Sequence, residues 1–317
     1  MKQKAGVSEL LRAYGTIFAG ILIVIVFSVM RPDAFFTMGN LVNITRQISL
    51  LVIIALGATL VMSVEEFDLS VGALASLGGV IGAKMAVAGA PIFLCFIAPV
   101  VICFAIGFVN GWIVTKFRVL SFITTLAMST ILGGFTFWFT GGATVFQDIP
   151  KSFTYVGTKT VLGAPILSII MLLLTVVFWF VMRHTAFGRK LYAIGGNEAA
   201  SQVSGINVKK YKNLAFALCA SLAALTGVLM ASRLGSAHPT GGDGLFLQSY
   251  AAAFLGRTFF REGVPNIWGT FVGAAILGVL ANGLTILQVP TFMQDLLTGC
   301  IIILAVVVQK IGRGDAK

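Results

Sequence analysis

The chain has 317 residues, of which 58% are hydrophobic and only 10% are charged. An ordinary soluble domain carries about 25% charged residues and has too small an interior to hide this much apolar surface, so the composition excludes a soluble globule. The net charge of +11 does not indicate a nucleic-acid partner, since the basic residues lie in short gaps between apolar runs rather than on one basic face. We therefore expect a membrane protein whose apolar side chains face lipid.

Ten apolar segments follow one another along the chain, most of them close to the length of about 20 residues that a membrane-spanning helix requires. The third is rich in Gly and Ala and contains Lys84, and the eighth is short, so either could be a broken or re-entrant helix. The pattern predicts an all-α polytopic membrane protein of about ten transmembrane helices. The segments are 14–30, 48–64, 70–88, 91–114, 119–139, 162–182, 213–232, 246–259, 266–287 and 291–309.

The loop 183–212 is the most basic connection between two apolar segments. It contains six Lys and Arg residues against the single acid Glu198, and loops with such an excess of positive charge remain in the cytoplasm. With ten spans, this places both termini and the turn 116–118 in the cytoplasm. The loops 140–161 and 233–245 then face outward.

An internal repeat relates two turns that lie five spans apart. One copy runs from Asn110-Gly111 to Val119 and Phe122, across the turn between the fourth and fifth segments, and the other runs from Asn282-Gly283 to Val289 and Phe292, across the turn between the ninth and tenth. Five spans between the copies would invert the two units with respect to the membrane, a common plan in transporters, whose solute site lies between the halves. We expect one transmembrane domain over residues 1–317, with inverted halves at roughly 35–160 and 200–310.

The acidic cluster at residues 65–68 interrupts apolar sequence directly before the third segment. Ionisable groups at membrane depth are costly, so they are candidates for a functional role. Asp68 could also cap a helix that starts near Leu69, by accepting hydrogen bonds from its first N–H groups, and both roles can hold together. If the solute passes between the inverted halves, we expect its pathway to be lined by Gln47, Asp68 and Ser70.

The sequence contains no recognisable catalytic constellation. Its two His residues fall on opposite sides of the expected membrane, and neither H-E-x-x-H nor G-x-S-x-G occurs. The glycine-rich run at 78–84 lacks the G-K-[ST] ending of a phosphate-binding loop. We therefore expect no enzyme activity, no metal site and no cofactor, and any ATP hydrolysis must come from another chain.

The basic loop 183–212 also contains a compact pattern of small and polar residues. Gly195 and Gly196 permit a tight turn, Asn197 can cap a helix, and residues 198–203 have helix-forming composition. Gly205 can end that helix in a left-handed conformation. The pattern predicts a short helix on the cytoplasmic surface, which is either an interfacial helix without a partner or a docking surface.

Several motifs resemble those of the ribose-type sugar ABC importer permeases. D-L-S-V-G at residues 68–72 is similar to the signature of that family, and the likeness extends from about residue 35 to 309. The segment 257–263 departs from the Gly-rich stretch usual there, which suggests another solute or a heteromeric partner. The other similar motifs are 185–189, 195–200, 204–208, Arg233-Leu234, Pro239-Thr240 and Asn282-Gly283.

The resemblance implies the membrane-spanning permease subunit of a binding-protein-dependent ABC importer in the bacterial inner membrane, which moves a monosaccharide or similar small polar solute into the cytoplasm. It also implies three protein partners: a cytoplasmic ATP-binding subunit, a periplasmic or lipoprotein sugar-binding protein, and a second permease chain. An alternative is a secondary transporter or channel without an ATPase. The implied ATPase-coupling residues are Gly195, Gly196, Asn197, Glu198, Ala199, Ala200, Ser204, Gly205 and Ile206.

Overall fold

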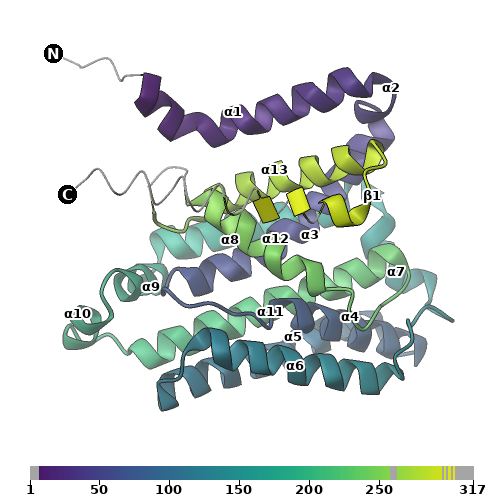
Figure 1. Cartoon of the computed structure of the whole chain (residues 1–317). Helices are drawn as coiled ribbons and strands as arrows, with labels where there is room; N and C mark the ends of the chain where they lie inside the picture. The colour runs from purple at the N-terminus through teal and green to yellow at the C-terminus, as the bar shows by residue number, and fades with distance from the viewer. Residues whose placement is uncertain (1–6, 258–262, 295, 298, 301–302, 304–317) are drawn as a thin grey trace.

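The protein is mostly helical in a computed structural model that describes residues 7–257, 263–294, 296–297, 299–300 and 303 (Figure 1). A two-stranded antiparallel hairpin, β1 (Thr160–Val161) and β2 (Ala164–Pro165), lies between α7 and α8. The helices are α1 (Val7–Met30), α2 (Pro32–Phe35), α3 (Met38–Met62), α4 (Val71–Val87), α5 (Ile92–Phe117), α6 (Ser121–Thr140), α7 (Lys151–Thr158), α8 (Ile166–His184), α9 (Ala186–Gly196), α10 (Glu198–Val203), α11 (Val208–Leu234), α12 (Asp243–Gly256) and α13 (Ile267–Ile286).

Helices cover nine of the ten predicted apolar segments, and the tenth lies mostly outside the described residues. Within the described residues, six helices are long and apolar enough to cross a membrane: α3, α5, α6, α8, α11 and α13. The segments singled out as irregular form shorter helices, since α4 has 17 residues and α12 has 14. A polytopic helical membrane protein is therefore confirmed, while the count of ten spans and the inverted repeat stay predictions.

Helices α3 and α11 form the centre of the bundle. Of their apolar stretches, 78% and 72% are buried, against 22% in α5 and α6 and 28% in α8. Small residues let α11 approach its neighbours closely, because a methyl group built on Gly227 would overlap the backbone of Ala75 in α4. The apolar outer faces of α5, α6 and α8 are the ones suited to lipid or to another membrane chain.

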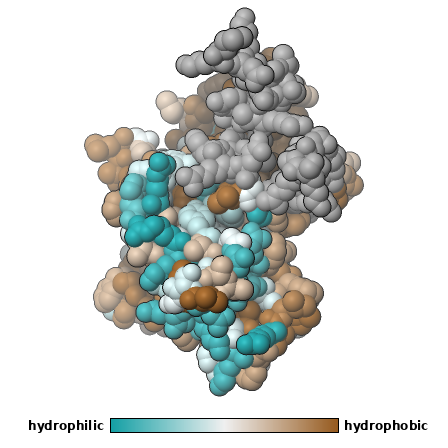
Figure 2. All heavy atoms as spheres, turned by 90° about the vertical axis from the view of Figure 1, so that its left-hand side faces the viewer, coloured by the Kyte–Doolittle hydropathy of each residue, from teal (hydrophilic) through white to brown (hydrophobic). Residues whose placement is uncertain are grey.

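The two ends of the bundle differ in character. Helices α9 and α10 lie at the left-hand end in Figure 1, where hydrophilic residues gather between hydrophobic flanks (Figure 2). At the opposite end, the loops 140–161 and 233–245 pair with each other, since Val145 and Ala237 exchange backbone hydrogen bonds of 2.9 and 2.8 Å. The loops predicted to lie outside thus share the end opposite to the basic loop 183–212.

Candidate functional site: the α9–α10 segment and the linker between α3 and α4

The segment predicted to dock on a partner folds as two short helices joined by a sharp corner. Asn197 forms the corner and caps α10, because its side chain accepts a hydrogen bond of 2.9 Å from the backbone N–H of Ala200. After α10, Gly205 takes a left-handed conformation with φ of +81°, and the backbone N–H of Ile206 donates to Ser201 at 3.0 Å. The predicted cap, short helix and left-handed ending are confirmed.

The two glycines before the corner have a different role from the predicted tight turn. Both are helical and form the last two residues of α9, and the chain turns one residue later, at Asn197. A methyl group on Gly195 would collide with the carbonyl oxygen of Ser63, whereas one on Gly196 would meet nothing within 4 Å. Gly195 is thus required by the close approach of α9 to the end of α3, a tertiary contact that the local pattern did not indicate.

Helix α10 exposes most of its surface. Ala199 and Ala200 are exposed, and the side chain of Val203 is 90% exposed. The Ser204 hydroxyl donates a hydrogen bond of 2.8 Å to the carbonyl oxygen of Ala200, which closes the last turn of the helix. The result is a short, rigid and exposed helix at one end of the bundle, with small side chains that permit close contact with another surface.

One lysine ties this exposed helix to the interior. The ammonium group of Lys212, in the second turn of α11, lies 2.7 Å from the carboxylate of Glu198 in α10 and 2.6 Å from that of Glu66. The side chain of Lys212 is only 9% exposed, and that of Glu66 only 16%. Glu66 belongs to the linker of residues 63–70 between α3 and α4, which runs from beside α9 back into the bundle (Figure 1).

The deep end of this linker holds two of the predicted pathway residues together. Asp68 and Ser70 are fully buried, and Oδ1 of Asp68 accepts hydrogen bonds from the backbone N–H and the hydroxyl of Ser70 at 2.9 and 2.5 Å. The side-chain amide of Asn110 donates to the Ser70 hydroxyl at 3.1 Å. Asn110 lies seven residues before the end of α5 at Phe117, which places this cluster about 10 Å inside the bundle.

The predicted capping role of Asp68 is wrong in its details. The helix begins at Val71 rather than near Leu69, its N-cap residue is Ser70, and that cap makes no side-chain hydrogen bond. Asp68 instead closes a turn one step earlier, on the N–H of Ser70, as a short acidic side chain commonly does. The carboxylate therefore fixes the linker rather than the first turn of α4.

Neighbouring helices hold the linker backbone from two sides. From α6, the hydroxyls of Ser121 and Thr125 accept hydrogen bonds from the N–H groups of Phe67 and Leu69, at 3.3 and 2.9 Å. From α12, the hydroxyl of Tyr250 accepts from the N–H of Asp68 at 2.6 Å. These side chains satisfy backbone groups that a break between two helices leaves open.

The linker also receives a second ion pair. Arg257, at the end of α12, lies 3.2 Å from the carboxylate of Glu65, and its guanidinium donates to the carbonyl oxygen of Gly263 at 3.0 and 2.7 Å. Glu65 itself has φ of +55°, in the left-handed region that non-glycine residues rarely adopt. The two adjacent acids of the linker are thus paired with two different helices, α11 and α12.

The structure does not bring the third predicted pathway residue to this cluster. Gln47 lies in α3, fifteen residues before the end of that helix at Met62, which is about 22 Å along the helix axis. It is half-buried, and none of the hydrogen bonds described for Asp68 or Ser70 involves it. If all three residues line one pathway, Gln47 belongs to its other end.

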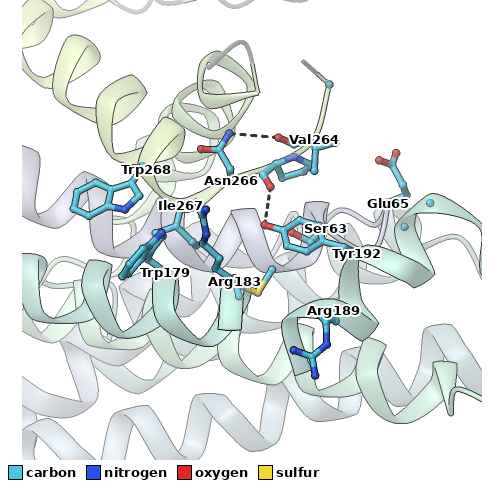
Figure 3. Close-up of a pocket in the computed structure, with 15 residues that line it drawn as sticks. Ser63, Glu65, Trp179, Arg183, Arg189, Tyr192, Val264, Asn266, Ile267 and Trp268 are labelled. Atoms are coloured by element: carbon cyan, nitrogen blue, oxygen red, sulfur yellow. Dashed lines mark hydrogen bonds between the residues drawn. The ribbon is translucent and has the colours of Figure 1, made fainter. Parts of the chain in front are cut away.

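A cavity of about 940 Å³ lies beside the α9–α10 segment (Figure 3). Trp179 and Trp268 stand at one side of it, with their rings 6.4 Å apart, and Glu65 lies at the other side. The hydroxyl of Tyr192 in α9 donates to the carbonyl oxygen of Pro265 at 2.9 Å. Because Gly195 also lines the cavity, the space separates α9 from the start of α13 and adjoins the point where α9 meets α3.

The site thus consists of the exposed helix α10, joined through Lys212 to the linker between α3 and α4 within a bundle of membrane helices. Among the described residues, no group of His, Cys, Asp or Glu side chains could hold a metal ion. The family described as "branched-chain amino acid transport system / permease component" matches residues 40–306. This match covers most of the chain, so the chain belongs to that family of permease components.

Curated relatives cover nearly the whole chain. It is 40% identical to the ribose import permease protein RbsC of Haemophilus influenzae over 289 residues, which are 90% of this chain and 89% of that protein. The match to RbsC of Escherichia coli K12 is 40% over 297 residues, 93% and 92% of the two chains. The D-allose transport system permease protein AlsC of the same strain is 35% identical over 301 residues, 94% and 91%. No solved structure matches the chain significantly.

The resemblance to ribose-type permeases that the motifs indicated is therefore confirmed. The sequence pattern did not single out Lys212, Glu66 or Arg257 as residues that act together. Lys212 belongs to a run of basic residues, with Lys209 and Lys210, that reads as a topology signal. Only the burial of Lys212 distinguishes it from these two exposed neighbours.

Proposed function

We propose that the chain is the membrane-spanning permease subunit of a binding-protein-dependent ABC importer that moves a monosaccharide or similar small polar solute into the cytoplasm. The supporting observation is the near full-length similarity to permeases whose names specify ribose and D-allose, and to the xylose transport system permease protein XylH of Haemophilus influenzae, which is 31% identical. The location that follows is the bacterial inner membrane.

Three partners are part of this proposal. A cytoplasmic ATP-binding subunit supplies the energy, a periplasmic or lipoprotein sugar-binding protein delivers the solute, and a second permease chain completes the membrane pore. The apolar outer faces of α5, α6 and α8 offer surfaces for that second chain and for lipid. The ten-span, five-plus-five inverted arrangement is also proposed, and in keeping with it Asn110 and Asn282 are both buried, seven and four residues before the ends of α5 and α13.

The segment 195–206 is proposed as the coupling element that contacts the ATP-binding subunit. Its support is geometric: α10 is capped at both ends, exposed on most of its surface and tied to the interior through Glu198. A coupling element has to be stiff to transmit a displacement, and the internal hydrogen bonds of a helix resist bending. The small residues Ala199 and Ala200 permit the close approach of a partner surface.

The solute pathway is proposed to pass Asp68 and Ser70, with Gln47 nearer the other end. Among the described buried atoms, Oδ2 of Asp68 and Oδ1 of Asn110 accept no hydrogen bond. Buried acceptors without donors are costly, and movement of the linker would let them meet water or the hydroxyl groups of a passing sugar. A site formed in this way binds the solute weakly and transiently, as an importer that must release its cargo requires.

The coupling role is tested by Ala200→Trp. Ala200 is exposed, so the bundle should fold, but the indole would obstruct close docking of a partner. We expect normal membrane insertion and loss of the ATPase stimulation that the loaded binding protein causes in proteoliposomes containing all subunits. Leu162→Trp, on a fully exposed residue at the opposite end, is the matched control. Full stimulated ATPase and normal uptake in the Ala200→Trp variant would contradict the proposal and favour an ATP-independent transporter.

A further inference from the structure

A single cation, the ammonium group of Lys212, connects the proposed coupling element to the interior of the bundle. Lys212 is within 2.7 Å of the carboxylate of Glu198 and 2.6 Å of that of Glu66, although Glu66 and Lys212 are 146 residues apart in sequence. Glu198 is the first residue of α10 and Glu66 lies in the linker between α3 and α4. The ammonium group therefore joins the protruding helix to the linker, and α11 carries it.

The two carboxylates differ in their surroundings. The Glu198 side chain is 56% exposed, whereas that of Glu66 is 16% exposed and that of Lys212 is 9% exposed. A pair with a mostly exposed acid is weakened by solvent, while the pair inside is screened much less. The Lys212–Glu66 pair is thus the permanent half of the bridge, and the Lys212–Glu198 pair is the half that a partner docked on α10 can strain or break.

The linker is built to pass such a displacement inward. Only Phe67 separates Glu66 from Asp68, and the N–H groups of Phe67, Asp68 and Leu69 are each held by a hydroxyl of α6 or α12. A pull on Glu66 cannot be absorbed locally without breaking one of these hydrogen bonds. The pull therefore also reaches Asp68, whose hydrogen bond to Tyr250 has to shift with it, and the buried cluster with Ser70, because packed elements switch between arrangements rather than deform continuously.

From this geometry we infer that Lys212 is the positioning residue that transmits movement of α10 to the linker 63–70 and thereby to the buried Asp68–Ser70 cluster. This inference rests on the proposed coupling function and adds to it the connection between the docking helix and the membrane interior. Lys212 touches neither solute nor nucleotide in this scheme; it acts through Glu66.

The test uses the complete importer reconstituted in proteoliposomes with its ATP-binding subunit and binding protein. We compare Lys212→Met, Glu198→Gln and Lys212→Arg, with Lys210→Met as the matched control on an exposed lysine of the same helix. The measured quantities are co-purification of the ATP-binding subunit, the melting temperature of the complex, and the ratio of ATPase rates with and without loaded binding protein. The ratio is the decisive quantity, because a merely structural role would lower the melting temperature without uncoupling the two rates.

For Lys212→Met and Glu198→Gln we expect the assembled complex with the stimulation ratio reduced at least about fivefold, the lower end of typical coupling between sites. Lys212→Arg, which keeps the cation, should retain most of the stimulation, and Lys210→Met should be normal. If Lys212→Met fails to assemble, Glu198→Gln decides, because it changes a mostly exposed side chain and leaves the Lys212–Glu66 pair in place.

Full stimulation in an assembled Glu198→Gln complex would overturn the inference. The Ala200→Trp variant then distinguishes an error in the role of Lys212 from an error in the proposed coupling function. If Ala200→Trp still abolishes stimulation, α10 docks on the ATP-binding subunit but signals through another contact. If Ala200→Trp is also normal, the proposed coupling function itself is wrong.

Discussion

The adjacent glycines at the end of α9 offer a sharp test of how closely the proposed coupling element must pack on the membrane core. Both are helical, yet their surroundings differ. A methyl group on Gly195 would lie 2.3 Å from the carbonyl oxygen of Ser63, about 1 Å short of the 3.4 Å at which ordinary contact begins, whereas one on Gly196 would meet nothing within 4 Å. The clashing atom belongs to the backbone, so no side-chain rotation can relieve the overlap.

We therefore expect Gly195→Ala to force α9 away from the end of α3. Overpacking of this kind costs about 1–3 kcal/mol. In a helix interior, alanine in place of glycine gains up to about 1 kcal/mol through helix propensity, a gain that both variants share in part. The difference in stability between Gly195→Ala and Gly196→Ala thus isolates the steric contact, with Gly196→Ala close to wild type or slightly more stable.

The assay is thermal unfolding of the detergent-purified protein, followed by tryptophan fluorescence, together with the ATPase stimulation ratio of the reconstituted importer. Gly195→Ala should melt at a lower temperature than Gly196→Ala and should show weaker stimulation, because α9 and α10 would be displaced together. Indistinguishable melting curves and stimulation ratios for the two variants would refute the close approach of α9 to Ser63.

Three further outcomes follow from the structure. In a cysteine-free background, Val203→Cys should react with an impermeant thiol reagent only from the cytoplasmic side and Leu162→Cys only from outside, and the reverse pattern would refute the orientation. Asp68→Asn keeps the Oδ1 acceptor but removes the charge, so it should fold normally while sugar uptake falls severalfold; unchanged uptake would remove Asp68 from the pathway. Gly227→Ala, whose methyl group would overlap α4, should reduce thermal stability by about 1–3 kcal/mol or more, whereas Gly133→Ala on the open side of α6 should not.

The features that the sequence predicted well are those set by residues close together in the chain. Apolar runs become helices wherever the run is long, and the third segment, rich in Gly and Ala, forms the 17-residue helix α4. The cap at Asn197 and the left-handed Gly205 were predictable for the same reason, because both depend on hydrogen bonds within a few residues. Such local rules operate whatever the rest of the bundle does.

The features that the sequence did not reveal depend on packing between distant segments. The capping role expected of Asp68 is wrong because hydroxyls of α6 and α12 bind the linker backbone as far as Leu69. The linker therefore stays non-helical up to that residue, and the helix begins only at Val71. Gly195 looked like a turn residue because its need for space arises from Ser63, far away in sequence. A lysine that sets the orientation in the membrane and a lysine that bridges two acids look the same in the sequence. Only burial in the folded protein distinguishes them.

The two ion pairs of the linker have unequal roles that follow from their partners. Arg257 also donates twice to the carbonyl oxygen of Gly263, so its guanidinium is fixed near the end of α12. The Glu65 side chain that it meets is 59% exposed, so solvent weakens this pair. Lys212 shares its ammonium with Glu198, whose exposed carboxylate can exchange protein contacts for water or for a partner's charge. The linker can pivot at Glu65 when Glu66 moves, because a solvent-weakened ion pair restrains Glu65 only slightly and its strained left-handed backbone is where such a pivot would be expected. Neutralising Glu65 or Glu198, whose side chains are both more than half exposed, should therefore leave the resting state intact, and only the change at Glu198 should reduce the response to the ATP-binding subunit.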